Sequence, residues 1–171
     1  MYDDLRRAGE LSARVHYSLL VAPGFMDKDA DRFDAVRRAH PDTPYLKLGV
    51  IKLFADGVIE TNTAFMLAPY DNDPSTRGTP NYSREELDRI VQMMDRRGWQ
   101  IMIHGLGDGA VRMVLDAFER AAAVNPAPAR GRQGDHDDRG RENCVSRPTL
   151  IASLSKFRCR HNQNRSSRNG R

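Results

Sequence analysis

The chain has 171 residues, of which 39% are hydrophobic and 29% charged, so its length predicts one domain or part of one. Its net charge of +4 is unevenly spread: residues 1–129 hold 16 basic and 19 acidic side chains, residues 130–171 hold 11 and 4. The slightly acidic first part argues against a nucleic-acid-binding body. No apolar run approaches the roughly 20 residues of a membrane helix. The first residues lack the apolar core of a signal peptide, so we expect no membrane partner and a cytoplasmic location.

Helix-like and strand-like segments alternate along residues 1–129. Apolar residues at helical spacing predict four helices, over residues 2–11, 27–40, 83–98 and 108–125. Runs of strand formers predict three strands, over residues 14–21, 46–56 and 99–104. Such alternation predicts an α/β fold with a parallel sheet and crossover helices, either a doubly wound sheet or part of a (β/α)₈ barrel.

The sequence also carries signals for one long loop and for two helix starts. The polar connection over residues 57–82 is long enough to predict either a functional or a disordered segment. Ser83 and Glu86 have the spacing of a capping box at the start of the third helix. Asp108 is placed to cap the last helix.

Lys52 is the first candidate for chemistry. Strand periodicity places it on one face with Leu48, Val50 and Phe54. A lysine on an apolar face needs a reason, because burial of an unpaired charge is costly. One interpretation is an ion pair, with Asp56 as the partner. The other is chemistry, because a desolvated lysine has a lowered pKa and acts as a nucleophile or is modified.

His104 is the second candidate, because it ends the strand that follows the connecting helix. Parallel barrels build their chemistry where strands end, and a neutral imidazole is a common metal ligand, although a hydrogen-bonding role is the alternative. Asp56 could orient such a ligand. Glu60, on the long connection, could meet substrate or be solvated. His16 lies among strand formers, which predicts a packing role.

Two motifs together resemble a known family. Residues 52–57 read Lys-x-Phe-x-Asp-Gly, and residues 104–108 read His-x-x-Gly-Asp. At this separation they resemble the amidohydrolase superfamily, and within it the third amidohydrolase family, which includes N-substituted formamide deformylases. The resemblance covers about residues 1–129. It implies part of a metal-dependent-hydrolase (β/α)₈ TIM barrel, about strands three to five with their helices.

The resemblance also implies functional residues. Lys52 falls on the strand-four ligand position, where the family lysine is often carboxylated, and His104 falls on the strand-five position. Asp56, Glu60 and Asp108 would support the ligands or the substrate loop. The implied cofactor is a divalent metal, zinc first, with one or two ions. The implied reaction is hydrolysis of a carbon–nitrogen bond in a small amide or formamide.

The chain departs from the family pattern in ways that predict low activity. No His-x-His occurs in the sequence, so the strand-one ligands are expected before Met1, and no strand-six histidine motif follows Arg130. Residues 130–171 are instead rich in arginine, which predicts a disordered or out-of-frame tail. Reading the gene in all frames would test the second idea. The general acid or base has no candidate here.

Two other functions are compatible with parts of the chain. The basic tail could bind nucleic acid electrostatically, but its only aromatic residue is Phe157, and stacking platforms need more. Lys52 could be the nucleophile of a Schiff-base lyase on a complete α/β scaffold. Salt-dependent DNA binding that requires the tail would favour the first function, and borohydride trapping on Lys52 would favour the second.

Overall fold

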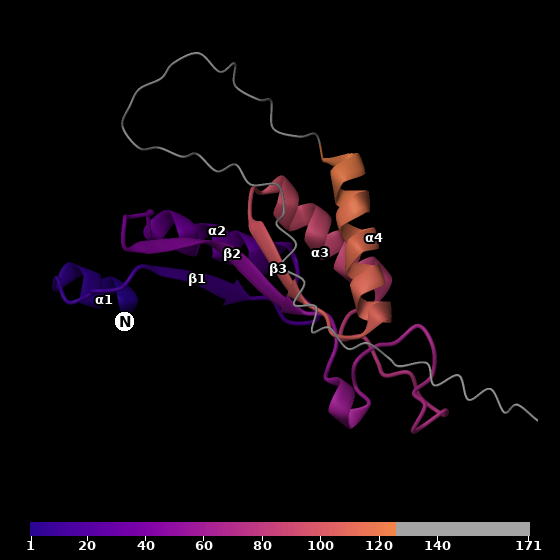
Figure 1. The fold of residues 1–171 in the computed structure, drawn as a ribbon. Helices are drawn as coiled ribbons and strands as arrows, with labels where there is room; N and C mark the ends of the chain where they lie inside the picture. The colour runs from indigo at the N-terminus through magenta and orange to yellow at the C-terminus, as the bar shows by residue number, and fades with distance from the viewer. Residues whose placement is uncertain (126–171) are drawn as a thin grey trace, which may run out of the picture.

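The computed structural model describes residues 1–125 (Figure 1). Its elements are α1 (Tyr2–Arg7), β1 (Val15–Leu20), α2 (Asp27–Ala39), β2 (Leu46–Phe54), the 3₁₀ helix η1 (Ile59–Thr61), α3 (Arg84–Arg96), β3 (Gln100–His104) and α4 (Asp108–Val124). This order confirms the predicted alternation. The predicted tail, residues 130–171, lies outside the described residues. Across residues 1–125, no helix combines the length and the apolar character that crossing a bilayer requires.

The three strands form one parallel sheet in the order β1-β2-β3. Helix α2 connects β1 to β2, and helix α3 connects β2 to β3, as parallel neighbours require. Figure 1 shows the strands side by side, with the long connection leaving the end of β2 and leading to α3. The predicted α/β fold with a parallel sheet and crossover helices is therefore confirmed.

The hydrophobic core lies on one face of this sheet. Helices α2, α3 and α4 each bury apolar side chains against it. The largest fully buried side chains of the strands and of α3 are Ile51, Leu53, Ile101, Leu87, Ile90 and Met94. Accessibility alternates along β1 and β3, because successive side chains point to opposite faces. The second face is more exposed: Leu20 is 62% and Phe54 44% accessible.

A register shift in β2 decides which residues occupy each face. Tyr17 pairs with Leu48, but Ser18 pairs with Val50, so Gly49 has no partner on β1. Such an extra residue reverses the alternation of side chains beyond it. Leu48 accordingly belongs to the same buried cluster as Ile51 and Leu53. The prediction that Leu48 shares a face with Lys52 was wrong, because simple alternation does not anticipate the bulge.

The start of α3 confirms one half of the predicted capping box. The Ser83 hydroxyl accepts a hydrogen bond from the Glu86 backbone N–H at 3.1 Å. The Glu86 carboxylate does not return to Ser83; it accepts instead from the Gly24 backbone N–H on the loop before α2. The Glu86 side chain thus joins two elements that are distant in sequence.

Trp99 joins helix α2 to the start of β3. The indole is 2% accessible, and its Nε1–H donates to Asp34 at 2.8 Å. Arg97 pairs with the same carboxylate at 2.8 Å, and the Arg37 guanidinium lies 4.3 Å from the ring centroid. Burial acts to raise the pKa of Asp34, but the Trp99 and Arg97 hydrogen bonds bring it below the ordinary 3.8. This cluster fixes one crossover helix to the sheet.

Candidate active site at the strand ends

Lys52 and His104 lie on the same face of the sheet, near the carboxyl ends of neighbouring strands. Lys52 is in register with Met102, and Phe54 is in register with His104. Because side chains alternate, all four residues share the more exposed face. The Lys52 Nζ is 4.7 Å from the centroid of the Phe54 ring, and the His104 ring centroid is 5.4 Å from it. The Phe54 ring therefore lies beside both predicted ligands.

Lys52 has no acidic partner within residues 1–125. The predicted ion pair with Asp56 is wrong, because the Asp56 carboxylate is engaged elsewhere. Burial lowers the pKa of Lys52 from the ordinary 10.5. The side chain is thus a partly desolvated amine whose charge the described residues do not neutralise.

We expect Lys52→Met to stabilise the protein slightly. Methionine keeps the apolar length and removes the desolvated charge, so the unfolding free energy at pH 7 should rise by about 0.5 kcal/mol. Since the folded-state pKa of Lys52 is depressed, wild-type stability should increase as pH rises towards 10.5, and the variant should lack this increase. Urea unfolding between pH 7 and 10 measures both effects. Lys47→Met, at an exposed position of the same strand, is the control, and equal stabilisation there would contradict the explanation.

Asp56 is buried, with 3% of its surface accessible. Its carboxylate accepts three backbone hydrogen bonds, from Phe65 at 2.9 Å, Leu106 at 3.0 Å and Gly107 at 2.8 Å. A carboxylate can remain buried when such donors replace water. Asp56 therefore joins the end of β2 to the long connection and to the turn after His104.

Asp108 forms a tertiary hydrogen bond, whereas Glu60 is exposed. Asp108 is the first residue of α4, and Gly107 precedes the helix in the capping position, so the predicted cap is wrong. The Asp108 carboxylate accepts instead from the Leu67 N–H at 2.8 Å, because the long connection passes over this helix start. Glu60 lies in η1, is exposed, and forms no ion pair within residues 1–125.

The long connection, residues 57–82, is held by hydrogen bonds within itself and to other parts of the fold. The Tyr70 hydroxyl donates to the Ala64 carbonyl at 2.6 Å, and the pKa of this phenol is raised by burial and by the nearby Asp56. At its end, the Asn81 N–H donates to the Ala55 carbonyl at 2.8 Å, and the Tyr82 hydroxyl to the Val21 carbonyl at 2.7 Å. Of the two predicted alternatives, disorder is excluded for this segment.

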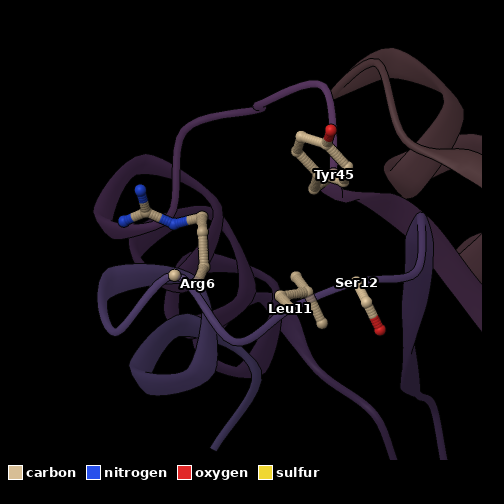
Figure 2. A pocket seen from close by; sticks show the side chains of 5 residues that line it. Arg6, Leu11, Ser12 and Tyr45 are labelled. Atoms are coloured by element: carbon tan, nitrogen blue, oxygen red, sulfur yellow. The ribbon is translucent and has the colours of Figure 1, made fainter.

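Two other features of the chain, a histidine and a pocket, lie away from the strand ends that carry Lys52 and His104. His16 is exposed on the open sheet face, so the predicted packing role is wrong; helices α2 to α4 cover the other face. A pocket of about 320 Å³ lies where β1 and β2 begin, at the opposite end of the strands (Figure 2). Its lining residues are Arg6, Gly9, Leu11, Ser12 and Tyr45. None of the predicted site residues lines it.

Two contributors to the site were given no role from the sequence. Simple alternation places Phe54 on the face of Lys52, but the ring was not connected with His104. Asn81 donates from its side chain to the Phe54 carbonyl at 2.9 Å. It lies 27 residues away in sequence, so no local pattern points to it.

The donors present fit part of a metal site. Within the described part of the chain, no group of three or more histidine, cysteine, aspartate or glutamate side chains is placed to hold a metal. A catalytic zinc takes three protein ligands and a water. His104 offers an imidazole. Lys52 offers an amine that has no acidic partner among residues 1–125 and that can become an oxygen ligand only after carboxylation. The pair could contribute to a metal site but could not complete one.

Comparison with known proteins decides the family. The model of the amidohydrolase family matches residues 1–158. The chain belongs to the amidohydrolase family. Among relatives of this family member, "Putative amidohydrolase YtcJ" of Bacillus subtilis is 38% identical over 72% of this chain and 22% of its own length. The N-substituted formamide deformylase of Arthrobacter pascens is 26% identical over 68% of this chain and 22% of its own length.

Solved structures agree with the family assignment. An uncharacterised metal-dependent hydrolase from Pyrococcus horikoshii is 32% identical, with a TM-score of 0.58 over 68% of this chain and 23% of that protein. This supports the predicted portion of a hydrolase TIM barrel. The amidohydrolase chain spans about a fifth of the length of the relatives it matches. The family match also continues to residue 158, beyond the predicted limit at residue 129.

Proposed function

We propose that this chain supplies part of the active site of a metal-dependent hydrolase that cleaves carbon–nitrogen bonds in small amides or formamides. The observation that carries the proposal is the placement of Lys52 and His104 on one face, at neighbouring strand ends and beside one aromatic ring. The family supports hydrolysis, and the name of the Arthrobacter relative supports a formamide-type substrate.

The state of Lys52 supports a role as a carboxylated ligand. Carboxylation needs the neutral amine, because the nitrogen lone pair attacks carbon dioxide and the resulting N–H proton is lost to solvent. The depressed pKa and the absence of an acidic partner within residues 1–125 both favour that neutral form. The product carries a negative charge and two oxygen donors, which suit a divalent metal, zinc first. The bound metal would activate water and polarise the scissile carbonyl.

Asp56, Glu60 and Asp108 have different places in this proposal. Asp56 and Asp108 hold the loops that border the strand ends, through backbone hydrogen bonds. Glu60 is free of ion pairs within the described residues and is exposed, so it is the candidate for contact with substrate. The general acid or base of the reaction has no candidate among residues 1–125.

Metal binding tests the ligand assignment. Cobalt(II) should bind the full 171-residue chain weakly in bicarbonate buffer, and a titration followed by its visible absorption measures the affinity. This affinity should fall at least about tenfold in Lys52→Met and in His104→Ala. Labelled bicarbonate should give a carbamate carbon signal that Lys52→Met abolishes. His16→Ala, on the same sheet face but on β1, is the control. Equal losses in all three variants would refute the assignment.

Turnover tests the expected inactivity of this chain alone. Two protein ligands do not complete a catalytic zinc site, so hydrolysis of N-substituted formamides should stay at the rate of the buffer blank with zinc and bicarbonate present. The measurement is release of formate or amine. Robust turnover that Lys52→Met abolishes would contradict the expected inactivity and retain the proposed site.

A second candidate rests on the same desolvated amine. A Schiff-base enzyme would use the neutral Lys52 as a nucleophile towards a carbonyl compound. Borohydride treatment with a small aldehyde, followed by mass spectrometry, separates the candidates. Selective reduction onto Lys52 with no carbamate signal would favour this alternative. The nucleic-acid alternative concerns residues 130–171, outside the described residues, as does the proposed out-of-frame origin, which reading the gene in all frames tests.

A further inference from the structure

Asp56 is the only buried acidic residue among residues 1–125. Within the described residues, the Asp56 carboxylate accepts three hydrogen bonds, all from backbone N–H groups of two other segments, around residue 65 and residues 106–107. We infer that Asp56 is a positioning residue, which fixes the turn after His104 and makes the long connection a fixed wall of the site. The inference rests on the proposed function and adds a residue role to it.

The first step concerns the backbone around His104. The His104 carbonyl accepts a hydrogen bond from the Ala55 N–H at 2.7 Å, so the backbone of His104 is joined directly to the residue that follows β2. The Asp56 carboxylate then binds Leu106 and Gly107, two and three residues further on. The chain is held to the end of β2 on both sides of Gly105. The backbone position from which the His104 side chain extends is therefore fixed relative to β2, the strand that also carries Lys52.

The second step concerns the long connection. The Phe65 N–H binds the Asp56 carboxylate, while the Phe65 carbonyl accepts from the Ala110 N–H at 3.0 Å. A side chain at Gly107 would overlap that carbonyl, so the two segments approach as closely as glycine permits. Asp108 binds Leu67 on the same stretch. Residues 64–67 and 105–110 thus interlock around one carboxylate.

This arrangement distinguishes a wall from a lid. A lid must separate from the turn beneath it, which here would take the Phe65 N–H away from the buried Asp56 carboxylate and break the hydrogen bonds of Phe65 and Leu67 to the start of α4. Substrate must therefore reach the strand ends without displacement of residues 64–67. Asp56 acts on the proposed ligands only through the backbone, without contact to reacting atoms.

Asp56→Asn in the full 171-residue chain tests the inference. An asparagine offers one carbonyl oxygen and places an NH₂ group against at least one N–H, so the interlock must loosen. Amide hydrogen exchange at Phe65, Leu106 and Gly107 should accelerate by at least about tenfold. The ring carbon–proton resonance of His104 should shift or broaden. The control is Asp71→Asn, an exposed residue of the same connection with no hydrogen bond in the described part of the chain.

Three outcomes would overturn the inference. The first is unchanged exchange and an unchanged His104 resonance in Asp56→Asn. The second is equal acceleration at the core strand amides of Ile51 and Ile101, which would assign Asp56 to global stability. The third applies if the variant fails to fold: in the wild-type protein, the amides of Leu106 and Gly107 would show no protection from hydrogen exchange. These readouts need neither metal nor substrate, so this experiment and the cobalt titration can fail separately.

Discussion

Gly78→Ala should destabilise the protein by about 3 kcal/mol, the sum of two costs. Gly78 has φ +74°, and an alanine in this left-handed region costs about 1 kcal/mol. Its Cβ would also overlap the carbonyl oxygen of the fully buried Ala64, which adds about 2 kcal/mol for a forced backbone shift. Urea unfolding followed by the fluorescence of Trp99, the only tryptophan of the chain, measures the change.

Gly98→Ala is a closely matched control. Gly98 follows α3 with φ +72°, and a Cβ there meets no atom within 4 Å. It should show only the cost of the left-handed backbone, about 1 kcal/mol. The difference between the two variants therefore isolates the close approach of the long connection to itself. Equal destabilisation would mean that residues 64 and 78 are not packed together in solution.

Trp99→Ala should cost about 4 kcal/mol. The indole is nearly inaccessible, and large-to-small changes of this kind leave a cavity. The change also removes the Nε1–H donor to Asp34 and the ring beneath Arg37. Because the variant has no tryptophan, far-UV circular dichroism must follow its urea unfolding.

Two further variants identify what Trp99 contributes. Tyr45→Ala removes an aromatic ring that is 51% accessible and should cost less than about 1 kcal/mol. Trp99→Phe keeps most of the buried area but loses the donor to Asp34, so it should fall between wild type and alanine. A Trp99→Ala cost as small as that of Tyr45→Ala would show that α2 is not anchored to the sheet through this residue.

The sequence predicted the parts of the site that depend on local pattern. Helix and strand periodicities located the elements, and the rule that parallel strands end at one edge brought Lys52 and His104 together. What failed depended on tertiary contacts. Asp56 lies four residues from Lys52, which made an ion pair attractive, yet its donors are 9 and about 50 residues away. Backbone N–H groups of remote loops leave no signature in side-chain identity.

The unpaired Gly49 has a consequence for how this chain can vary. It is the extra residue of β2: without it, the pairs Tyr17–Leu48 and Ser18–Val50 would follow each other directly, and Ile51 and Leu53 would still face the helices while Lys52 and Phe54 faced the open side. A deletion at this position should therefore remove the irregularity and leave both the core and the candidate chemistry on their present faces. Substitution at position 49 also has free space around it, so β2 should accept either kind of change there.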